Sequence, residues 1–162
     1  MLKTIYSLLS NEELLFLNSM CFPFIASSKF SIINKNNFYI RKILNVKNDL
    51  LEYQKNCITH LGGEYEIQGL WINKINVTTN QQDDFHTDDS EISIVTYLNE
   101  DFQGGEFEYI FKNKKIKIKP IKNCSLIMDE TMQHRVLNVT SGERFSLISF
   151  YKKAQKKQKT LL

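Results

Sequence analysis

Asp84-Phe85-His86-Thr87-Asp88 is the stretch around which this chain of 162 residues is organised. In an extended segment alternate side chains lie on one face, so His86 and Asp88 project together while Thr87 points away. A neutral imidazole beside a carboxylate supplies two ligands of a two-histidine, one-carboxylate metal site, which leaves positions on the metal open. Spacing alone does not choose the carboxylate, because Asp84 shares the same face.

The second histidine of such a site has few candidates, because the chain contains only His60, His86 and His134. His60 ends a segment with helical spacing. A histidine in that position more often complements the helix dipole or packs as structure than binds a metal. We therefore interpret His134 as the second histidine ligand, and the alternative interpretation is a packed strand histidine.

Arg144 lies ten residues after His134, across a polar turn. A planar guanidinium can grip a carboxylate with two hydrogen bonds, as the far end of a metal-chelating dicarboxylate would require. Arg135 is the other candidate, but as the strand neighbour of His134 it should point to the opposite face. Ser146 shares the face of Arg144, so its hydroxyl can add a hydrogen bond to the same carboxylate.

Together these residues resemble the Fe(II)/2-oxoglutarate-dependent oxygenases, nearest the prolyl-4-hydroxylase-like branch. The resemblance covers roughly residues 70 to 151 and is carried, in order, by His86-Thr87-Asp88, Thr96-Tyr97-Leu98-Asn99, Gly104-Gly105-Glu106-Phe107, His134-Arg135-Val136-Leu137 and Ser141-Gly142-Glu143-Arg144-Phe145-Ser146. It selects Asp88 over Asp84.

The resemblance also implies what the individual residues do. His86, Asp88 and His134 would be the catalytic residues and would bind Fe(II). Arg144, with Ser146 and Tyr97, would bind the cosubstrate 2-oxoglutarate. For Tyr97 a cross-strand core aromatic is an equally good interpretation.

The implied activity is that of an enzyme, a non-haem iron dioxygenase. It would use O₂ to hydroxylate an unactivated C–H bond and convert 2-oxoglutarate to succinate, with ascorbate as a candidate reductant. The substrate would be a prolyl or other peptidyl residue, a free amino acid or a small metabolite. The alternative is a non-catalytic, cupin-like metal-binding jelly-roll module, which would leave Arg144 without a role.

Two further positions bear on the branch of the family. Relatives near the prolyl hydroxylases often carry a tyrosine ten residues before the first histidine ligand, where this chain has Asn76. The nucleic-acid demethylase branch carries a second arginine six residues after the cosubstrate arginine, where this chain has Phe150. The first difference questions one cosubstrate contact, and the second argues against the demethylase branch.

The fold is predicted from a change of apolar period along the chain. Ser10 and Glu13 form a capping box that starts a helix over about 11–20, ended by Pro23. A weak hairpin over 28–40 and a second helix over about 48–61, which stops at Gly62-Gly63, follow. After Gly63 the period is two, which predicts strands at 65–77, 84–88, 92–98, 107–111, 116–118, 124–128, 135–139 and 144–151.

This order of elements favours a mainly β (α+β) class with a double-stranded β-helix, or jelly roll. We expect one oxygenase domain over 1–151, in which N-terminal helices at about 1–62 brace a core at about 63–151. A basic tail follows at 152–162. The loops 78–83 and 99–105 are expected to line the entrance of the site.

Composition bounds the cellular setting. An apolar fraction of 42% and a charged fraction of 24% are ordinary for a soluble globular protein. The net charge of +3 is small and is concentrated in the tail, so it does not favour a nucleic-acid partner. Three cysteines without a C-x-x-C pair favour free thiols in a reducing compartment. No apolar run approaches eighteen residues, and we expect a cytoplasmic protein without a membrane segment.

Overall fold

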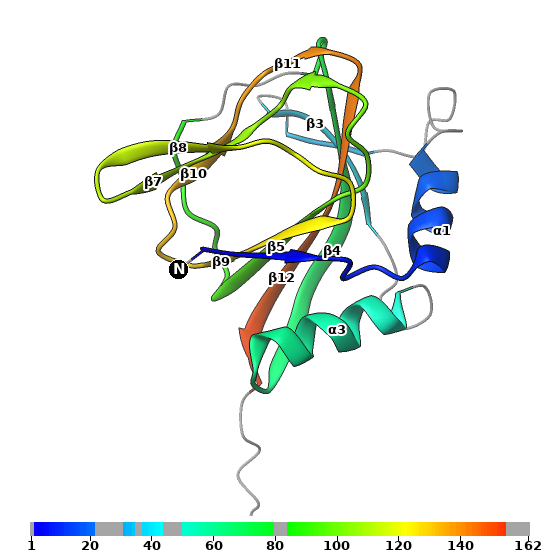
Figure 1. Cartoon of the computed structure of the whole chain (residues 1–162), viewed down its shortest axis with the longest axis vertical. Helices are drawn as coiled ribbons and strands as arrows, with labels where there is room; N and C mark the ends of the chain where they lie inside the picture. Colours follow the sequence, from blue (N-terminus) through cyan, green and yellow to red (C-terminus); the bar gives the residue numbers. More distant parts are fainter. Residues whose placement is uncertain (1, 22–30, 35–36, 44–49, 80–83, 155–162) are drawn as a thin grey trace, which may run out of the picture.

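The computed structural model describes residues 2–21, 31–34, 37–43, 50–79 and 84–154. Antiparallel strands dominate this part of the chain, and two helices lie beside the larger sheet (Figure 1). The predicted mainly β class is confirmed. Pro23 as a helix end, the turn of the early hairpin and residues 155–162 of the basic tail fall outside the described residues. The first two residues of the tail expected at 152–162, Lys152 and Lys153, belong to the last strand, which pairs them with Glu66 and Tyr65.

The predicted capping box is present at the start of the first helix. The Glu13 amide donates to Ser10 Oγ at 3.1 Å, and the Ser10 amide donates to the Glu13 carboxylate at 3.1 Å. The second helix ends at Gly62, whose positive φ of 67° suits glycine. The elements are β1 (Leu2–Tyr6), α1 (Asn11–Cys21), β2 (Ser31–Asn34), β3 (Asn37–Ile43) and α3 (Leu51–Leu61).

The sequence did not predict β1. This strand pairs antiparallel with β9 (Cys124–Asp129), about 120 residues later in the chain. Its pattern shows a single buried side chain, Ile5, so it has almost no apolar period of its own. The N-terminal region therefore contributes strands to the sheet as well as helices that cover it.

The rest of the chain is a run of strands. They are β4 (Tyr65–Asn76), β5 (Ile92–Tyr97), β6 (Gln103–Gly104), β7 (Phe107–Phe111), β8 (Lys114–Ile118), β9, β10 (His134–Val136), β11 (Val139–Ser141) and β12 (Glu143–Lys153). Among the described residues the strands form a seven-stranded sheet in the order β1-β9-β5-β12-β4-β3-β2, a three-stranded sheet β10-β7-β8 and a pair β11-β6.

Three local predictions were wrong. The motif segment 84–88 is not a strand and makes one isolated bridge, between His86 and His134. The strand expected at 135–139 is divided into β10 and β11, which pair with different partners. The loop expected at 99–105 contains β6. In each case the pairing partner lies far away in sequence, so local periodicity carries no information about it.

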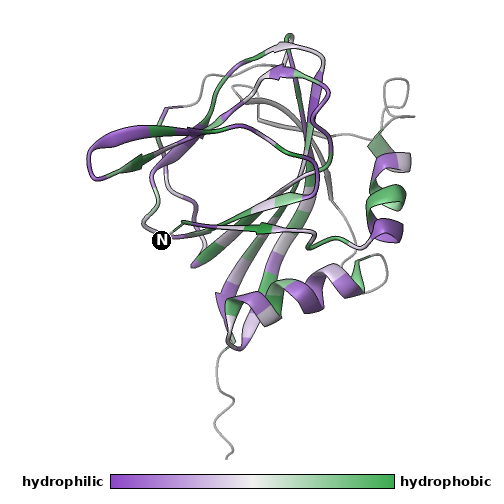
Figure 2. Cartoon of the chain, viewed as in Figure 1, coloured by the Kyte–Doolittle hydropathy of each residue, from purple (hydrophilic) through white to green (hydrophobic). Residues whose placement is uncertain are grey.

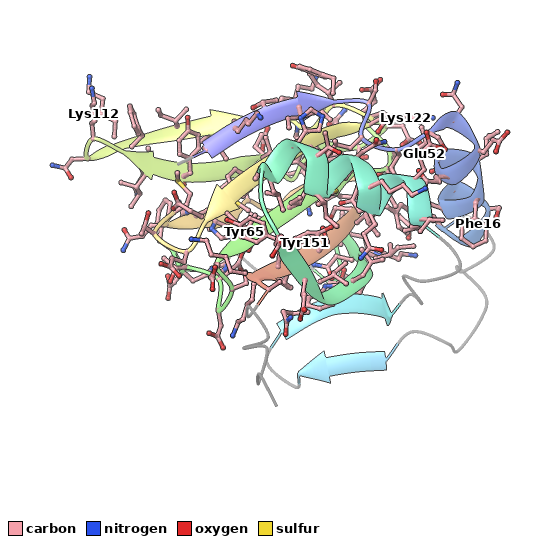
Figure 3. All side chains as sticks on the ribbon, turned by 90° about the horizontal axis from the view of Figure 1, so that it is seen from below. Phe16, Glu52, Tyr65, Lys112, Lys122 and Tyr151 are labelled. Atoms are coloured by element: carbon pink, nitrogen blue, oxygen red, sulfur yellow. The ribbon has the colours of Figure 1, made fainter. Side chains whose placement is uncertain are left out.

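The large sheet separates two apolar layers. On one face α1 and α3 pack against the strands through residues such as Leu17, Tyr53 and Leu147. On the other face the three-stranded sheet covers residues such as Val95 and Leu126. Figure 2 shows hydrophilic residues along β8, whose lysines face solvent. Figure 3 places Lys112 at the tip of the β7–β8 hairpin, on the side of the molecule away from α1.

Two expectations from composition can be compared with the structure. Cys21, Cys57 and Cys124 are all buried, and none of them forms a disulfide, as predicted. Neither of the described helices carries an apolar stretch long enough to cross a bilayer.

Candidate functional site

The structure brings the three predicted metal ligands together. One ligand atom from each of His86, Asp88 and His134 lies within 4.8 Å of the others. The two imidazole rings have centroids 4.6 Å apart, and His134 Nε2 lies 3.7 Å from an Asp88 carboxylate oxygen. Two imidazoles and one carboxylate at this spacing fit a single divalent ion.

A short backbone contact places the two histidines. The His86 amide donates to the His134 carbonyl at 3.0 Å, and the His134 amide donates to the His86 carbonyl at 2.9 Å. Residues that exchange both hydrogen bonds in an antiparallel pair carry their side chains on the same face. The extended geometry assumed from the sequence is therefore present at His86, although no longer strand forms around it.

Both imidazoles have their tautomer fixed by a carbonyl two residues earlier. His86 Nδ1 lies 3.0 Å from the Asp84 carbonyl oxygen, and His134 Nδ1 lies 3.0 Å from the Met132 carbonyl oxygen. A carbonyl can only accept, so each Nδ1 carries the proton and each neutral ring keeps a free lone pair on Nε2. Asp84 thus contributes its backbone, and Asp88 is the carboxylate that completes the group.

Burial favours the neutral, metal-binding form of His134. Desolvation lowers the pKa of this histidine below its ordinary value of 6.5, and the neighbouring His86 lowers it further. The hydrogen bond to Met132 and the charge of Asp88 act in the opposite direction. Phe107 stacks on the His134 ring, with centroids 5.1 Å apart, and holds it against the small sheet.

His86, Asp88 and His134 line a cavity of about 470 Å³ between the seven-stranded and the three-stranded sheet. This volume is within the range of small-molecule sites in proteins. Its wall is apolar apart from the ligand group and a polar set on β4 and β12. The described lining residues are Trp71, Asn73, Ile75, Asp84, His86, Asp88, Val95, Phe107, His134, Val136, Arg144, Ile148 and Phe150.

Arg144 is the most unusual side chain in this cavity, because it is a cation with only 1% of its surface exposed. Its Nη1 donates to Ser146 Oγ at 3.3 Å, and its guanidinium carbon lies 5.2 Å from the Tyr97 ring centroid. Nε has no hydrogen-bond partner, and no carboxylate among the described residues forms an ion pair with it. Burial lowers the pKa of Arg144, yet a guanidinium stays protonated in proteins.

Two more buried polar atoms lie near this cation without a partner in the described structure, Tyr97 Oη and Asn73 Oδ1. Burial raises the pKa of Tyr97 to about 12, although the charge of Arg144 opposes the shift, so the phenol stays neutral and can donate. Asn73 stands opposite Ser146 in the β4–β12 register. Unpaired buried polar groups are costly, and Arg144 Nε and Tyr97 Oη can both donate, which indicates that a polar, anionic ligand completes this part of the cavity. Asn73 Oδ1 is an acceptor and would need a donor from the same ligand or its surroundings.

Asn73 was not identified from the sequence. The signal was present in β4, where Trp71, Asn73 and Ile75 alternate toward the cavity and a polar residue interrupts two apolar ones. Asn76, the position compared with the family tyrosine, lies at the strand end instead. Its Oδ1 accepts from the Thr78 and Thr79 amides, each at 3.0 Å, so it forms a turn and does not line the cavity.

Arg135 is on the opposite face of β10, as the strand alternation predicted. Its Nε and Nη2 each lie 2.7 Å from one Glu108 carboxylate oxygen. It is therefore already paired and is not a candidate for the cavity anion. The loop 99–105, expected at the entrance, contributes none of the described lining residues, and only Thr78 and Thr79 of the loop 78–83 are described.

Comparison with known proteins agrees with this geometry. Residues 70–152 match the sequence profile of the 2OG-Fe(II) oxygenase superfamily. A search of curated protein sequences finds no match.

Among solved structures the chain is similar to a 2OG-Fe(II) oxygenase family oxidoreductase from Burkholderia pseudomallei, with 18% identity, a TM-score of 0.73 and coverage of 94% of this chain and 84% of that one. A prolyl-4-hydroxylase from Pseudomonas putida matches with 16% identity, a TM-score of 0.70 and coverage of 95% and 93%. A Trichoplax adhaerens prolyl hydroxylase, solved with a hypoxia inducible factor peptide, matches with 16% identity, a TM-score of 0.71 and coverage of 93% and 82%. These similarities confirm the predicted jelly-roll fold.

Proposed function

The chain belongs to the 2OG-Fe(II) oxygenase superfamily, and we propose that it hydroxylates an unactivated C–H bond while converting 2-oxoglutarate to succinate and CO₂. The observation that carries this proposal is the buried Arg144, which has no ion-pair partner among the described residues and lines the same cavity as His86, Asp88 and His134. A metal-binding jelly roll without oxygenase activity would not need a buried cation in the same cavity as its metal ligands.

The metal would be held by His86, Asp88 and His134. The carbonyls of Asp84 and Met132 accept from Nδ1 of the two histidines, so both rings are oriented before any ion arrives. When bound, Fe(II) together with O₂ and 2-oxoglutarate supplies the oxidising chemistry, and ascorbate would keep the iron reduced.

The cosubstrate would be held at the other end of the cavity. Arg144 would receive the far carboxylate of 2-oxoglutarate and gain the anionic partner that it lacks in the described structure. Ser146 already accepts from Arg144, and its own proton remains available for that carboxylate. Tyr97 would donate its phenolic proton, and we add Asn73 to this set because it lines the same cavity and its Nδ2 group can donate.

The substrate would lie along an aromatic wall beside the metal ligands. Trp71 and Phe150 have ring centroids 4.9 Å apart, and both rings line the main cavity. They also line a second hollow of about 320 Å³ that extends to Gly69 and Asp89. Aromatic rings at this position favour an apolar or cyclic group with a polar extension. A prolyl or other peptidyl residue, a free amino acid or a small metabolite meets that description, and similar structures include prolyl hydroxylases.

The first test is succinate formation from 2-oxoglutarate by anaerobically purified protein supplied with Fe(II), ascorbate and air. His86→Ala should abolish turnover because it removes one ligand of the metal. His60→Ala is the matched control, since His60 is an exposed residue of α3 that does not line the cavity. Retained turnover in His86→Ala would contradict the proposed ligand set.

The same assay can rank peptide and metabolite pools, because a prime substrate should raise the rate of succinate formation. A signal without any substrate that is lost in His86→Ala already establishes the reaction class. Absence of succinate with every pool, together with absence of 2-oxoglutarate binding, would favour the metal-binding module instead.

A further inference from the structure

The ligand His86 lies in a segment with little secondary structure of its own. Asp84 to Asp88 form a single backbone bridge, and the exposed side chains of Asp84, His86, Thr87 and Asp89 offer few packing contacts. One pair of hydrogen bonds does not by itself fix the direction of a side chain. A ligand that must meet two others within 4.8 Å therefore needs a further restraint.

Phe85 is the residue of this segment whose side chain packs on cations of the small sheet. Its ring centroid lies 4.5 Å from the Arg135 guanidinium carbon and 5.4 Å from Lys115 Nζ. Cations over an aromatic face are attracted by its quadrupole, and a guanidinium also stacks on the ring. Phe85 is only partly exposed, in contrast to its two neighbours.

The position of Phe85 follows from the bridge. His86 is opposite His134 in an antiparallel pair, so the preceding residue, Phe85, is opposite the following one, Arg135. The two histidines point into the cavity, and Phe85 and Arg135 therefore lie on the other face of β10. The cross-strand pair of metal ligands and the pair formed by Phe85 and Arg135 are adjacent and share the same backbone.

Arg135 is itself firmly held. Two of its nitrogens lie 2.7 Å from a single oxygen of Glu108, whose side chain is 5% exposed. Glu108 is opposite Arg135 in the β7–β10 register, so the ion pair joins two strands of the small sheet. A buried carboxylate paired in this way fixes the guanidinium, and the guanidinium offers a rigid platform to the aromatic ring.

We propose that Phe85, packed on the Glu108–Arg135 ion pair, is a positioning residue that fixes His86 in the arrangement competent for metal binding. Phe85 lies between Asp84, whose carbonyl orients the His86 ring, and His86 itself. Anchoring this one side chain therefore restrains both the ligand and the group that selects its tautomer. The inference rests on the metal site of the proposed function and adds a residue outside the cavity to it.

The test is the affinity for Mn²⁺ alone, an oxygen-stable substitute for Fe(II), measured by the loss of the free-ion electron paramagnetic resonance signal. Phe85→Ala should raise the dissociation constant by about tenfold, the lower range for loss of a group that orients a metal ligand. Phe85→Tyr keeps the aromatic face and should restore the affinity. Thermal unfolding of the metal-free proteins, measured in parallel, separates positioning from stability.

Phe111→Ala is the matched control. Phe111 belongs to the same small sheet and also lies under a lysine, with Lys112 Nζ 5.4 Å from its ring centroid. Phe111 contacts none of the three proposed metal ligands in the described part of the chain, so its loss should leave Mn²⁺ affinity unchanged. If Phe85→Ala does not fold, Phe85→Leu retains apolar packing without the quadrupole and should still weaken binding.

Three results would overturn the proposal. Phe85→Ala or Phe85→Leu binds Mn²⁺ as tightly as the unaltered protein, or Phe85→Ala and Phe111→Ala weaken binding equally, or Phe85→Ala lowers the unfolding temperature with no change in affinity. A different result separates the proposed function from this inference. If His86→Ala binds Mn²⁺ as well as the unaltered protein, the metal site itself is wrong, and the positioning role falls with it.

Discussion

The two faces of the seven-stranded sheet both bury polar side chains, but among the described residues the helix face pairs nearly all of them and the cavity face leaves several without a hydrogen-bond partner. On the helix face Tyr53 Oη lies 3.2 Å from Thr96 Oγ1 and 3.1 Å from Ser149 Oγ, and Thr96 Oγ1 lies 2.7 Å from Ser125 Oγ. Glu13 also reaches this layer and accepts from the Tyr53 amide at 2.8 Å. We call these five residues the helix-face network.

On the cavity face the corresponding groups are incomplete. Arg144 Nε, Tyr97 Oη and Asn73 Oδ1 are buried without a hydrogen-bond partner in the described part of the chain. On the helix face Tyr151 Oη, at the edge of the helix-face network, is the exception. The same strands supply both sides, since Thr96 and Tyr97 are consecutive residues of β5.

The difference teaches that burial of polar groups does not by itself mark a functional site. A network that closes on itself stabilises the fold, whereas one that contains a buried cation and open donors is stable only if a ligand completes it or if packing elsewhere offsets its cost. Mutations should therefore affect stability on the helix face and ligand affinity on the cavity face.

Arg144→Met should have the largest effect. Removing one partner of a buried charge pair typically costs about 2–5 kcal/mol of binding energy, so 2-oxoglutarate affinity should fall by about 30-fold or more. The unfolding free energy of the ligand-free protein should stay the same or rise, because a buried charge without an ion-pair partner among the described residues is replaced by an apolar side chain. Isothermal titration and denaturant unfolding measure the two quantities, and Arg144→Lys should be intermediate in affinity. An unchanged affinity for 2-oxoglutarate would contradict the role assigned to Arg144.

Glu13→Ala should have the largest effect on the helix face. It removes acceptors for the amides of Ser10 and Tyr53, which lie at the starts of α1 and α3, and should lower the unfolding free energy by about 2 kcal/mol. Its neighbour Glu12 is exposed in the same first turn, so Glu12→Ala is the control and should change stability by only a few tenths of a kcal/mol. Denaturant titration tests both. Equal losses would show that Glu13 acts through its charge alone.

A matched pair of tyrosines compares the faces directly. Tyr53→Phe removes a hydroxyl with two partners and should lower the unfolding free energy by about 1 kcal/mol without changing 2-oxoglutarate affinity. Tyr97→Phe removes a hydroxyl that has no hydrogen-bond partner among the described residues, so it should leave the unfolding free energy unchanged. The same change should lower the affinity for 2-oxoglutarate by about fivefold. The same two measurements apply to both variants. If Tyr97→Phe is as destabilised as Tyr53→Phe, the two faces do not differ in the way proposed.

The smallest effect is the dependence of stability on pH. Burial lowers the pKa of His134 below 6.5, so the unfolded chain binds its proton more readily than the folded protein. The contribution of His134 to stability is complete above that value and is lost as the pH falls through the folded pKa. On the helix face burial raises the pKa of Cys57 to about 11 and raises that of Tyr53, so these groups do not titrate there. Denaturant unfolding over about pH 7.5 to about pH 5.5 should show a decline that His134→Gln reduces.

Several features of the fold could be read from local sequence. The capping box at Ser10 and Glu13, the glycine stop at Gly62 and the strand over 65–76 depend on neighbouring residues, and all three formed as predicted. Of the early hairpin over 28–40, the described strands β2 and β3 pair as expected. β1 was missed because it is defined by its pairing with β9 rather than by its own pattern.

The candidate site was also predictable in part. The ordered residues His86, Asp88, His134 and Arg144 were assembled from their spacing and their resemblance to a family, and they line one cavity. Asn73 and Phe85 were not found, because their significance depends on what lies opposite them. Asn73 is opposite Ser146, and Phe85 packs on Arg135.

The chemical nature of the site therefore followed from sequence: two imidazoles, a carboxylate and a guanidinium, in a β-rich chain. Spacing left Asp84 and Asp88 equivalent and the family resemblance selected Asp88. The tertiary structure agrees, since the Asp88 carboxylate lies with the two histidines while Asp84 contributes its backbone carbonyl to His86. The tertiary structure also decided which buried polar groups have hydrogen-bond partners and which have none among the described residues. These outcomes depend on contacts between residues far apart in the chain, which a local pattern does not encode.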